Sequence, residues 1–171
     1  RNPNCWNRAA TGPCRTEWSN NMMDYNALQL ALTPCQIGKV HYNFARLNSK
    51  QRGMLEPTWC QYKPLQKVHI REAALTWDCH RDIESDIFIH EGASLTLLCR
   101  LSMPPGSKIV VKPGGRLVLN DAYLHNDCGE KWLGIEIWKT KEGEGEVIST
   151  DNTVIADANF PITTTTKNQP D

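Results

Sequence analysis

The sequence predicts a mostly β protein: a short parallel β-solenoid, like a right-handed β-helix, preceded by a small loop-and-helix unit. From position 68 onward, short apolar runs alternate with turns that contain Gly and Pro. Residues 87–97 align with residues 109–119 at an offset of 22, so that apolar positions match and Gly92 falls on Gly114. A repeat of about 20–25 residues, with two short strands and a glycine at the corner, is typical of one solenoid coil. An antiparallel sandwich with two similar hairpins is the alternative fold.

The individual strands are expected to be short, because turn residues interrupt each apolar run after a few positions. The expected strands are 67–70, 87–89, 95–98, 109–111, 117–119, 135–138 and 147–148. Residues 152–158 are a candidate start of a further coil, so the solenoid is assigned to residues 66–160. Residues 161–171 contain four consecutive threonines and are interpreted as a tail or linker, or as the end of the last coil.

The first 65 residues form the predicted loop-and-helix unit. Residues 1–26 show no periodicity, whereas Thr33 is a good helix N-cap and Pro34 suits the first helical position. Four side chains then fall on one helical face: Ile37, Val40, His41 and Phe44. The charge favours a boundary near position 65, because residues 1–65 carry 8 Lys+Arg and 3 Asp+Glu, whereas residues 66–171 carry 11 and 16. Two units of opposite charge would attract each other across an interface.

Composition and cysteine usage indicate a globular protein of an oxidising compartment. The 171 residues are 40% hydrophobic and 22% charged with zero net charge, which gives no general case for binding nucleic acid or a membrane surface. No apolar run approaches the ~18–20 residues that span a bilayer. Seven widely spaced cysteines without a CxxC motif favour disulfides over a zinc ribbon, although their pairing stays open and the odd number leaves one thiol over. The expected location is extracellular or at the cell surface, and the first residue, Arg1, suggests a processed or trimmed chain.

One stretch of the first unit resembles part of a zinc protease. The stretch Asn21-Met22-Met23-Asp24-Tyr25 resembles the Met-turn of metzincins, and Leu32 to His41 is similar to the Thr-Pro-x-Gln opening of their last catalytic-domain helix. Together, over residues 5–47, they resemble the pappalysin-type branch found in secreted proteins of Bacteroidetes. The resemblance implies that Met23 lies beneath the zinc-binding histidines and that Tyr25 binds zinc or stabilises the tetrahedral transition state. A phenol suits that role because it donates a hydrogen bond to negative charge developing beside the metal.

The zinc-binding motif of that family is missing. The family binds zinc through H-E-x-x-H-x-x-G-x-x-H, whereas none of the five histidines here is spaced in that way. The chain alone is therefore not expected to be an enzyme, and no metal site or cofactor is predicted in it. Zinc, and a catalytic role for Tyr25, would require an upstream segment that carries the ligands. The alternative is that Met23 and Tyr25 are ordinary core residues of a loop.

A second resemblance covers residues 87–158. The stretches 106–117 and 128–138 resemble β-helix modules of Bacteroidetes cell-surface proteins, which often follow catalytic or adhesive domains. In addition, Trp132 and Trp138 are expected to share one face of a strand by the period of two, and could form a strip that stacks on carbohydrate. The alternative is that one of the two tryptophans packs inside a coil.

Two functions from different classes follow. The first is the non-catalytic C-terminal portion of a secreted or cell-surface metalloprotease-like protein, in which the solenoid serves docking or assembly. Its expected partner is an upstream protease segment or another protein chain. The alternative is a structural or adhesive surface protein without protease activity, with a glycan as a further candidate partner. Neither nucleic acid nor a transmembrane segment is expected.

Overall fold

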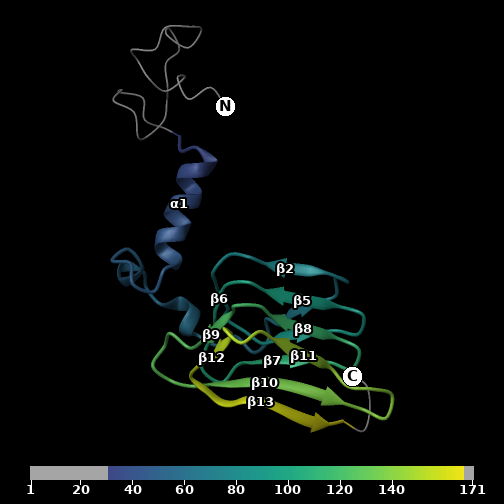
Figure 1. Ribbon diagram of the computed structural model, residues 1–171. Helices are drawn as coiled ribbons and strands as arrows, with labels where there is room; N and C mark the ends of the chain where they lie inside the picture. Colours follow the sequence, from purple (N-terminus) through teal and green to yellow (C-terminus); the bar gives the residue numbers. More distant parts are fainter. Residues whose placement is uncertain (1–30, 168–171) are drawn as a thin grey trace, which may run out of the picture. The chain divides into compact units, whose positions relative to one another are not determined.

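The computed structural model describes residues 31–167 (Figure 1). The chain divides into two compact units, Arg1–Phe44 and Ala45–Asp171, which are described separately. Within the described residues, no helix has the length and apolar character needed to cross a membrane.

Helix α1 (Pro34–Ala45) begins where the sequence predicts. The Thr33 hydroxyl accepts a hydrogen bond from the Gln36 amide at 3.3 Å, and the Gln36 side-chain oxygen accepts one from the Thr33 amide at 2.7 Å. This reciprocal pair is a capping box, which satisfies two backbone donors that a helix otherwise leaves free. The predicted N-cap at Thr33 is therefore confirmed. The predicted apolar face is not buried among the described residues, since Ile37 and Val40 are each 43% exposed.

The second unit is a parallel β-solenoid of about four coils, so the predicted fold class is confirmed. The first sheet contains β1 (Val68–Ile70), β4 (Ile87–Ile89), β7 (Lys108–Val111), β10 (Trp132–Lys139) and β13 (Ala158–Thr166). The second sheet contains β2 (Leu75–Trp77), β5 (Ser94–Leu97), β8 (Arg116–Leu119) and β11 (Glu146–Ser149). The third sheet contains β3 (Arg81–Asp82), β6 (Arg100–Ser102), β9 (Tyr123–His125) and β12 (Val154–Ile155). Every strand pair within these sheets is parallel, which rules out the sandwich alternative.

The strand register confirms the 22-residue repeat. Ile87 pairs with Ile109 in the first sheet, and Leu95 pairs with Leu117 in the second. All four side chains are fully buried, so each coil packs its inward residues directly on the equivalent residues of the next coil. Stacked Ile and Leu columns of this kind bury apolar surface along the whole solenoid, and this burial is the main force that holds the coils together.

The Thr-rich segment is a strand and not a free tail. β13 pairs with β10 from the Trp132↔Ala158 pair to the Lys139↔Thr166 pair, which makes it the fifth strand of the first sheet. Of the two interpretations given for residues 161–171, the end of the last coil therefore holds for residues 161–166, and residues 168–171 lie outside the described part. The linker interpretation fails because residues 158–166 satisfy their backbone hydrogen bonds against β10. Phe160, on this outer strand, is 63% exposed.

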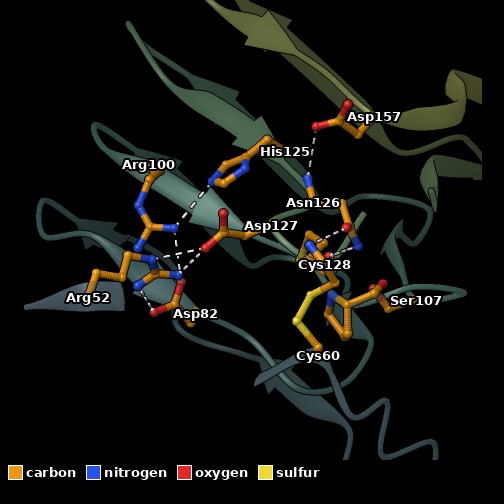
Figure 2. The surroundings of a disulfide bond; sticks show 12 residues. Arg52, Cys60, Asp82, Arg100, Ser107, His125, Asn126, Asp127, Cys128 and Asp157 are labelled. Carbon is orange, nitrogen blue, oxygen red and sulfur yellow. Dashed lines mark hydrogen bonds and ion pairs between the residues drawn. A yellow bond between two sulfur atoms is a disulfide. The ribbon is translucent and has the colours of Figure 1, made fainter. Parts of the chain in front are cut away.

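A buried ion-pair cluster joins residues 45–66 to the coils (Figure 2). The Arg52 guanidinium, only 5% exposed, donates to both carboxylate oxygens of Asp82 at 2.8 and 2.9 Å. It also donates twice to one oxygen of Asp127, at 2.7 and 2.9 Å. Arg100, from β6, donates to Asp82 at 2.9 Å. The cluster therefore links a 3-10 turn at Arg52–Met54 to the third sheet through charge-assisted bonds.

A disulfide lies beside this cluster (Figure 2). Cys60, from the 3-10 turn Thr58–Cys60, is bonded to Cys128 in the loop after β9, with the two Cα atoms 5.5 Å apart. The expectation of disulfides is thus confirmed for this pair. The two compact units divide at Phe44/Ala45, whereas the change in charge falls near position 65; the disulfide and the Arg52 ion pairs attach residues 45–66 to the solenoid. Long-range contacts such as this disulfide and these ion pairs cannot be predicted from the composition of the sequence.

The charge state of His125 makes the stability of this region depend on pH. Its Nε2 lies 3.2 Å from Nη1 of Arg100, which carries only donors, so Nε2 must accept and the ring is neutral. Burial, followed by the charge of Arg100, lowers the pKa of His125, and Asp127 only partly opposes this. Since the folded pKa lies below the unfolded value of about 6.5, the neutral ring contributes stability fully above that pH. This contribution is lost as the pH falls through the folded pKa.

We therefore expect the free energy of unfolding to be steady between about pH 7 and 8 and to decrease below about pH 6.5. Urea unfolding at pH 7.5, 6.5 and 5.5 measures the change. The His125→Gln variant keeps a polar group but cannot titrate, so its decrease should be smaller than that of the parent protein. An equal decrease in both proteins would show that His125 is not responsible.

Candidate functional site

The outer face of the first sheet carries an apolar cluster that does not belong to the core. In β4 and β7, residues on either side of Phe88 and Val110 point into the coils, so these two side chains point outward. Together with Trp138 from β10 they form a separate buried cluster, in which the Phe88 and Trp138 rings meet edge to face at 6.2 Å. Val110 is fully buried although it faces away from the core. Other side chains must therefore cover this cluster.

Lysine side chains provide that cover. The Lys67 ammonium lies 5.1 Å from the centre of the Phe88 ring. The ammonium groups of Lys112 and Lys167 lie 5.2 and 4.6 Å from the Trp138 ring. These distances are in the range of cation–π attraction, which holds a flexible lysine in one place. Within residues 31–167, none of the three lysines belongs to an ion pair, so their charge is not neutralised by a carboxylate.

Two histidines from neighbouring coils extend the same face. Nδ1 of His69 and Nε2 of His90 lie 2.8 Å apart, so that one ring nitrogen donates and the other accepts. The His69 ring also stacks on Phe88, with centroids 5.7 Å apart. Burial lowers the pKa of both histidines, and the positive charges of Arg71 and Lys112 lower it further. Both rings are therefore neutral near pH 7, in a local potential that is positive.

The carboxylate of Glu136, on this face, is already paired. Glu136 of β10 accepts a hydrogen bond from Lys108 at 2.6 Å. Burial acts to raise the pKa of Glu136, but hydrogen bonds from Lys108 and Thr165 outweigh it, so the pKa lies below the usual range. The pair contributes no net charge. The lysines that cover the rings, and Arg71, therefore determine the sign of the face.

We call this surface the basic-aromatic face. Its members are Lys67, His69, Phe88, His90, Lys112, Trp138 and Lys167. They lie on, directly before or directly after all five strands of the first sheet, and Figure 1 shows β7, β10 and β13 side by side. A positive, partly rigid surface of this kind suits an anionic ligand.

The structure separates the two tryptophans that the sequence pattern places together. Trp138 belongs to the basic-aromatic face, but Trp132 is fully buried in the core, with its indole N–H donating to the Ala156 carbonyl at 2.8 Å. A register shift between Gly134 and Ile135 is the reason. The extra residue of this shift, Pro161, lies in β13, and in β10 the alternation of faces breaks opposite it at Gly134, whose φ is +106°. The period of two therefore does not hold from 132 to 138. The expected shared surface strip of Trp132 and Trp138 is therefore wrong.

Most residues of the basic-aromatic face were not singled out from the sequence. The equivalence of His90 and Lys112 follows from the 22-residue repeat, and it is the signal that could have led to the others. His69 is 21 residues before His90, but its coil is shorter and gives no clear alignment. Lys167 follows β13, a segment for which the sequence pattern leaves a tail, a linker or the end of the last coil open. Contacts between coils of unequal length therefore cannot be predicted from the repeat in the sequence.

The protease-like residues cannot be placed in the same way. Met23 and Tyr25 lie outside the described residues, so their roles stay predictions. In the part of the chain that the structure describes, no group of three or more His, Cys, Asp or Glu side chains is arranged to hold a metal ion. Comparisons with models of protein families, with curated proteins and with solved structures gave no match.

Proposed function

We propose that this chain is a non-catalytic module of a secreted or cell-surface protein, whose solenoid binds an acidic polysaccharide on the basic-aromatic face. The observation that carries the proposal is a set of three lysines that form no ion pair within residues 31–167 and lie over a buried aromatic pair. The Cys60–Cys128 disulfide supports an oxidising, extracellular location. The solenoid also leaves Phe160 on its outermost strand exposed, which supports a role in docking or assembly beside ligand binding.

The charge of the face favours an anionic ligand. Lys67, Lys112 and Lys167 approach it from three different coils, while Glu136 is occupied by Lys108. The aromatic rings restrict the lysines before any ligand arrives, so less side-chain entropy is lost on binding. A ligand carboxylate or sulfate would thus meet ammonium groups that are already in position.

The extent of the face favours a polymer with regular charges over a single small anion. Neighbouring strands lie about 4.8 Å apart, so the five strands of the first sheet span roughly 19 Å from β1 to β13. The cations lie beside β1, β7 and β13, that is, at both edges and in the middle of the sheet. A chain of acidic sugars that crosses the strands would contact several of them at once. An acidic protein segment is the competing ligand, and the experiment below separates the two.

We further propose that the module adjoins a metalloprotease-like segment. The support is the Met-turn resemblance around Met23 and Tyr25, together with a helix that starts with a capping box at Thr33 and Gln36. In this arrangement the solenoid would hold the protease on an acidic glycan, and the zinc ligands would come from outside this chain. A surface protein without protease activity would use the same face in the same way.

Removing two of the lysines tests the binding function. We expect the double variant Lys112→Gln, Lys167→Gln to bind sulfated or carboxylated polysaccharide at least about tenfold more weakly, since two charge-assisted contacts are lost. Biolayer interferometry with immobilised chondroitin sulfate and polygalacturonate measures this, with neutral dextran as the ligand control. Binding by the parent protein should also weaken as salt rises, because the contacts are ionic.

The matched control is Lys50→Gln, Lys131→Gln, which removes the same charge from lysines that contact neither ring. It should bind like the parent protein. If both double variants lose affinity equally, binding reflects overall charge and the face is not a site. If the parent binds polyglutamate as well as the polysaccharides, the ligand is an acidic protein segment and the glycan assignment is wrong.

A further inference from the structure

The corner between the second and third sheets places two cysteines at equivalent positions of neighbouring coils. Before the corner, Trp77 pairs with Leu97, and after it Arg81 pairs with Leu101. Both pairs have a separation of 20 residues, so the corner itself contains no insertion. Cys79 and Cys99, also 20 residues apart, therefore lie opposite each other in the first two coils.

The spacing of coils fits the geometry of a disulfide. Paired residues of neighbouring parallel strands lie about 4.8 Å apart, and a disulfide requires Cα atoms about 4.4–6.8 Å apart. The Leu98 amide donates to the Trp77 carbonyl at 2.9 Å, and the Arg100 amide donates to Nδ1 of His80 at 3.2 Å, which keeps the two corners in contact on both sides. Both thiols are free in this structure, and Sγ of Cys99 already lies 2.8 Å from the carbonyl oxygen of Cys79.

We propose that Cys79 and Cys99 form a second disulfide, which fastens the first coil of the solenoid to the second. The proposal is independent of the polysaccharide function. Its consequence is local: the first coil contains β1, β2 and β3 and carries Lys67 and His69 of the basic-aromatic face. A covalent link at the corner would hold this outermost coil in register.

The chemistry requires an oxidant that itself carries a disulfide, such as oxidised glutathione. Cys79 is exposed, so its thiolate attacks one sulfur of the oxidant, and the other sulfur leaves as a thiolate. Sγ of Cys99, once deprotonated, then attacks Sγ of Cys79 in the mixed disulfide and displaces the second thiolate. The two protons lost by the protein thiols end on the two released thiolates. The protein thiols are oxidised and the oxidant is reduced to two thiols.

The order of attack follows from exposure. Cys99 is buried, although it lines a shallow surface pocket of about 380 Å³ together with His80 and Arg100. Burial raises the pKa of the Cys99 thiol, and the proximity of Cys79 raises it further. A buried thiol with a raised pKa is a poor first nucleophile, but it can react with a partner that lies directly beside it. Cys99 is therefore the resolving thiol.

Peptide mapping tests the proposal on the full chain. The protein is incubated in a glutathione buffer in which Cys60–Cys128 is intact, alkylated, and digested with trypsin without reduction. Trypsin separates Cys79 in peptide 72–81 from Cys99 in peptide 82–100. We expect these two peptides to be joined, and to separate after reduction. If both cysteines carry the alkylating label instead, or if Cys79 is joined to Cys35 or to a second chain, the proposal is overturned.

Variants show whether the bond acts on the fold. The exposed Cys79→Ser should lower the midpoint of thermal unfolding of the oxidised protein by about 5 °C, because a 20-residue loop is no longer closed in the unfolded state. Cys35→Ser, which also removes one exposed thiol, should leave the midpoint unchanged. Equal midpoints for Cys79→Ser and Cys35→Ser under oxidising conditions would contradict a stabilising disulfide.

Discussion

Gly134→Ala is expected to cost about 3 kcal/mol or more of unfolding free energy, through the loss of the pairing between β10 and β13. Gly134 has a φ of +106°, a backbone conformation that residues other than glycine rarely adopt. A Cβ atom at this position would overlap the carbonyl oxygen of Phe160, the residue with which Gly134 pairs. The backbone cannot move away without breaking the register shift that places Trp132 inside and Trp138 outside. Urea unfolding followed by tryptophan fluorescence measures the loss.

Gly92→Ala is the matched control for that substitution. Gly92 also has a positive φ, +71°, but no atom lies within 4 Å of an added Cβ. Gly92→Ala therefore introduces the backbone strain without the steric overlap, and should lower the free energy of unfolding by only about 1 kcal/mol. If the two variants are equally destabilised, the close approach of β13 at Gly134 is not a constraint on the fold.

Arg52→Ala is expected to destabilise the protein by about 3 kcal/mol. The substitution removes four hydrogen bonds that a nearly buried guanidinium makes to Asp82 and Asp127. Asp82 would retain Arg100, but Asp127 would lose the charge that faces it. The stacking of Arg52 on the Trp59 ring, at 4.3 Å, would be lost as well. Urea unfolding at pH 7.5 measures the effect.

Lys139→Ala provides the comparison with an exposed ion pair. The Lys139–Glu144 pair has a similar distance, 2.9 Å, but both side chains are more than half exposed. Water and salt screen such a pair, so its loss should cost about 0.5 kcal/mol or less. A cost for Arg52→Ala as small as that for Lys139→Ala would mean that residues 45–66 are not held by the cluster.

The sequence predicts the solenoid because the first two strands of the second and third coils have the same spacing. Ile87 and Ile109 fall into register at a single offset, and the glycine corners repeat with them. Other strands escape prediction because they are two or three residues long, such as Arg81–Asp82, and contain no apolar run. Their backbone forms strand pairs only because the neighbouring coils place a strand beside them. Local pattern is therefore enough for the fold class but not for the complete set of strands.

The candidate site was less predictable for a related reason. A single register shift at Gly134 reverses the faces of Trp132 and Trp138, and the period of two cannot reveal it. Likewise the contacts of Lys67 with Phe88, and of Lys167 with Trp138, join residues 21 and 29 positions apart in coils of unequal length. The boundary at Phe44/Ala45 depends on Arg52 and Cys60, whose partners lie far along the chain. Each of these features is a long-range contact.

The most direct test of the basic-aromatic face is to follow the histidine rings by NMR while a sulfated oligosaccharide is added. An anion bound beside His69 and His90 would offset the positive charges that now lower their pKa, so both pKa values should rise. The ring signals of these two histidines should shift, while those of His41, His80 and His125 stay in place. If His69 and His90 titrate identically with and without the oligosaccharide, while it binds, the ligand lies elsewhere and the central proposal is wrong.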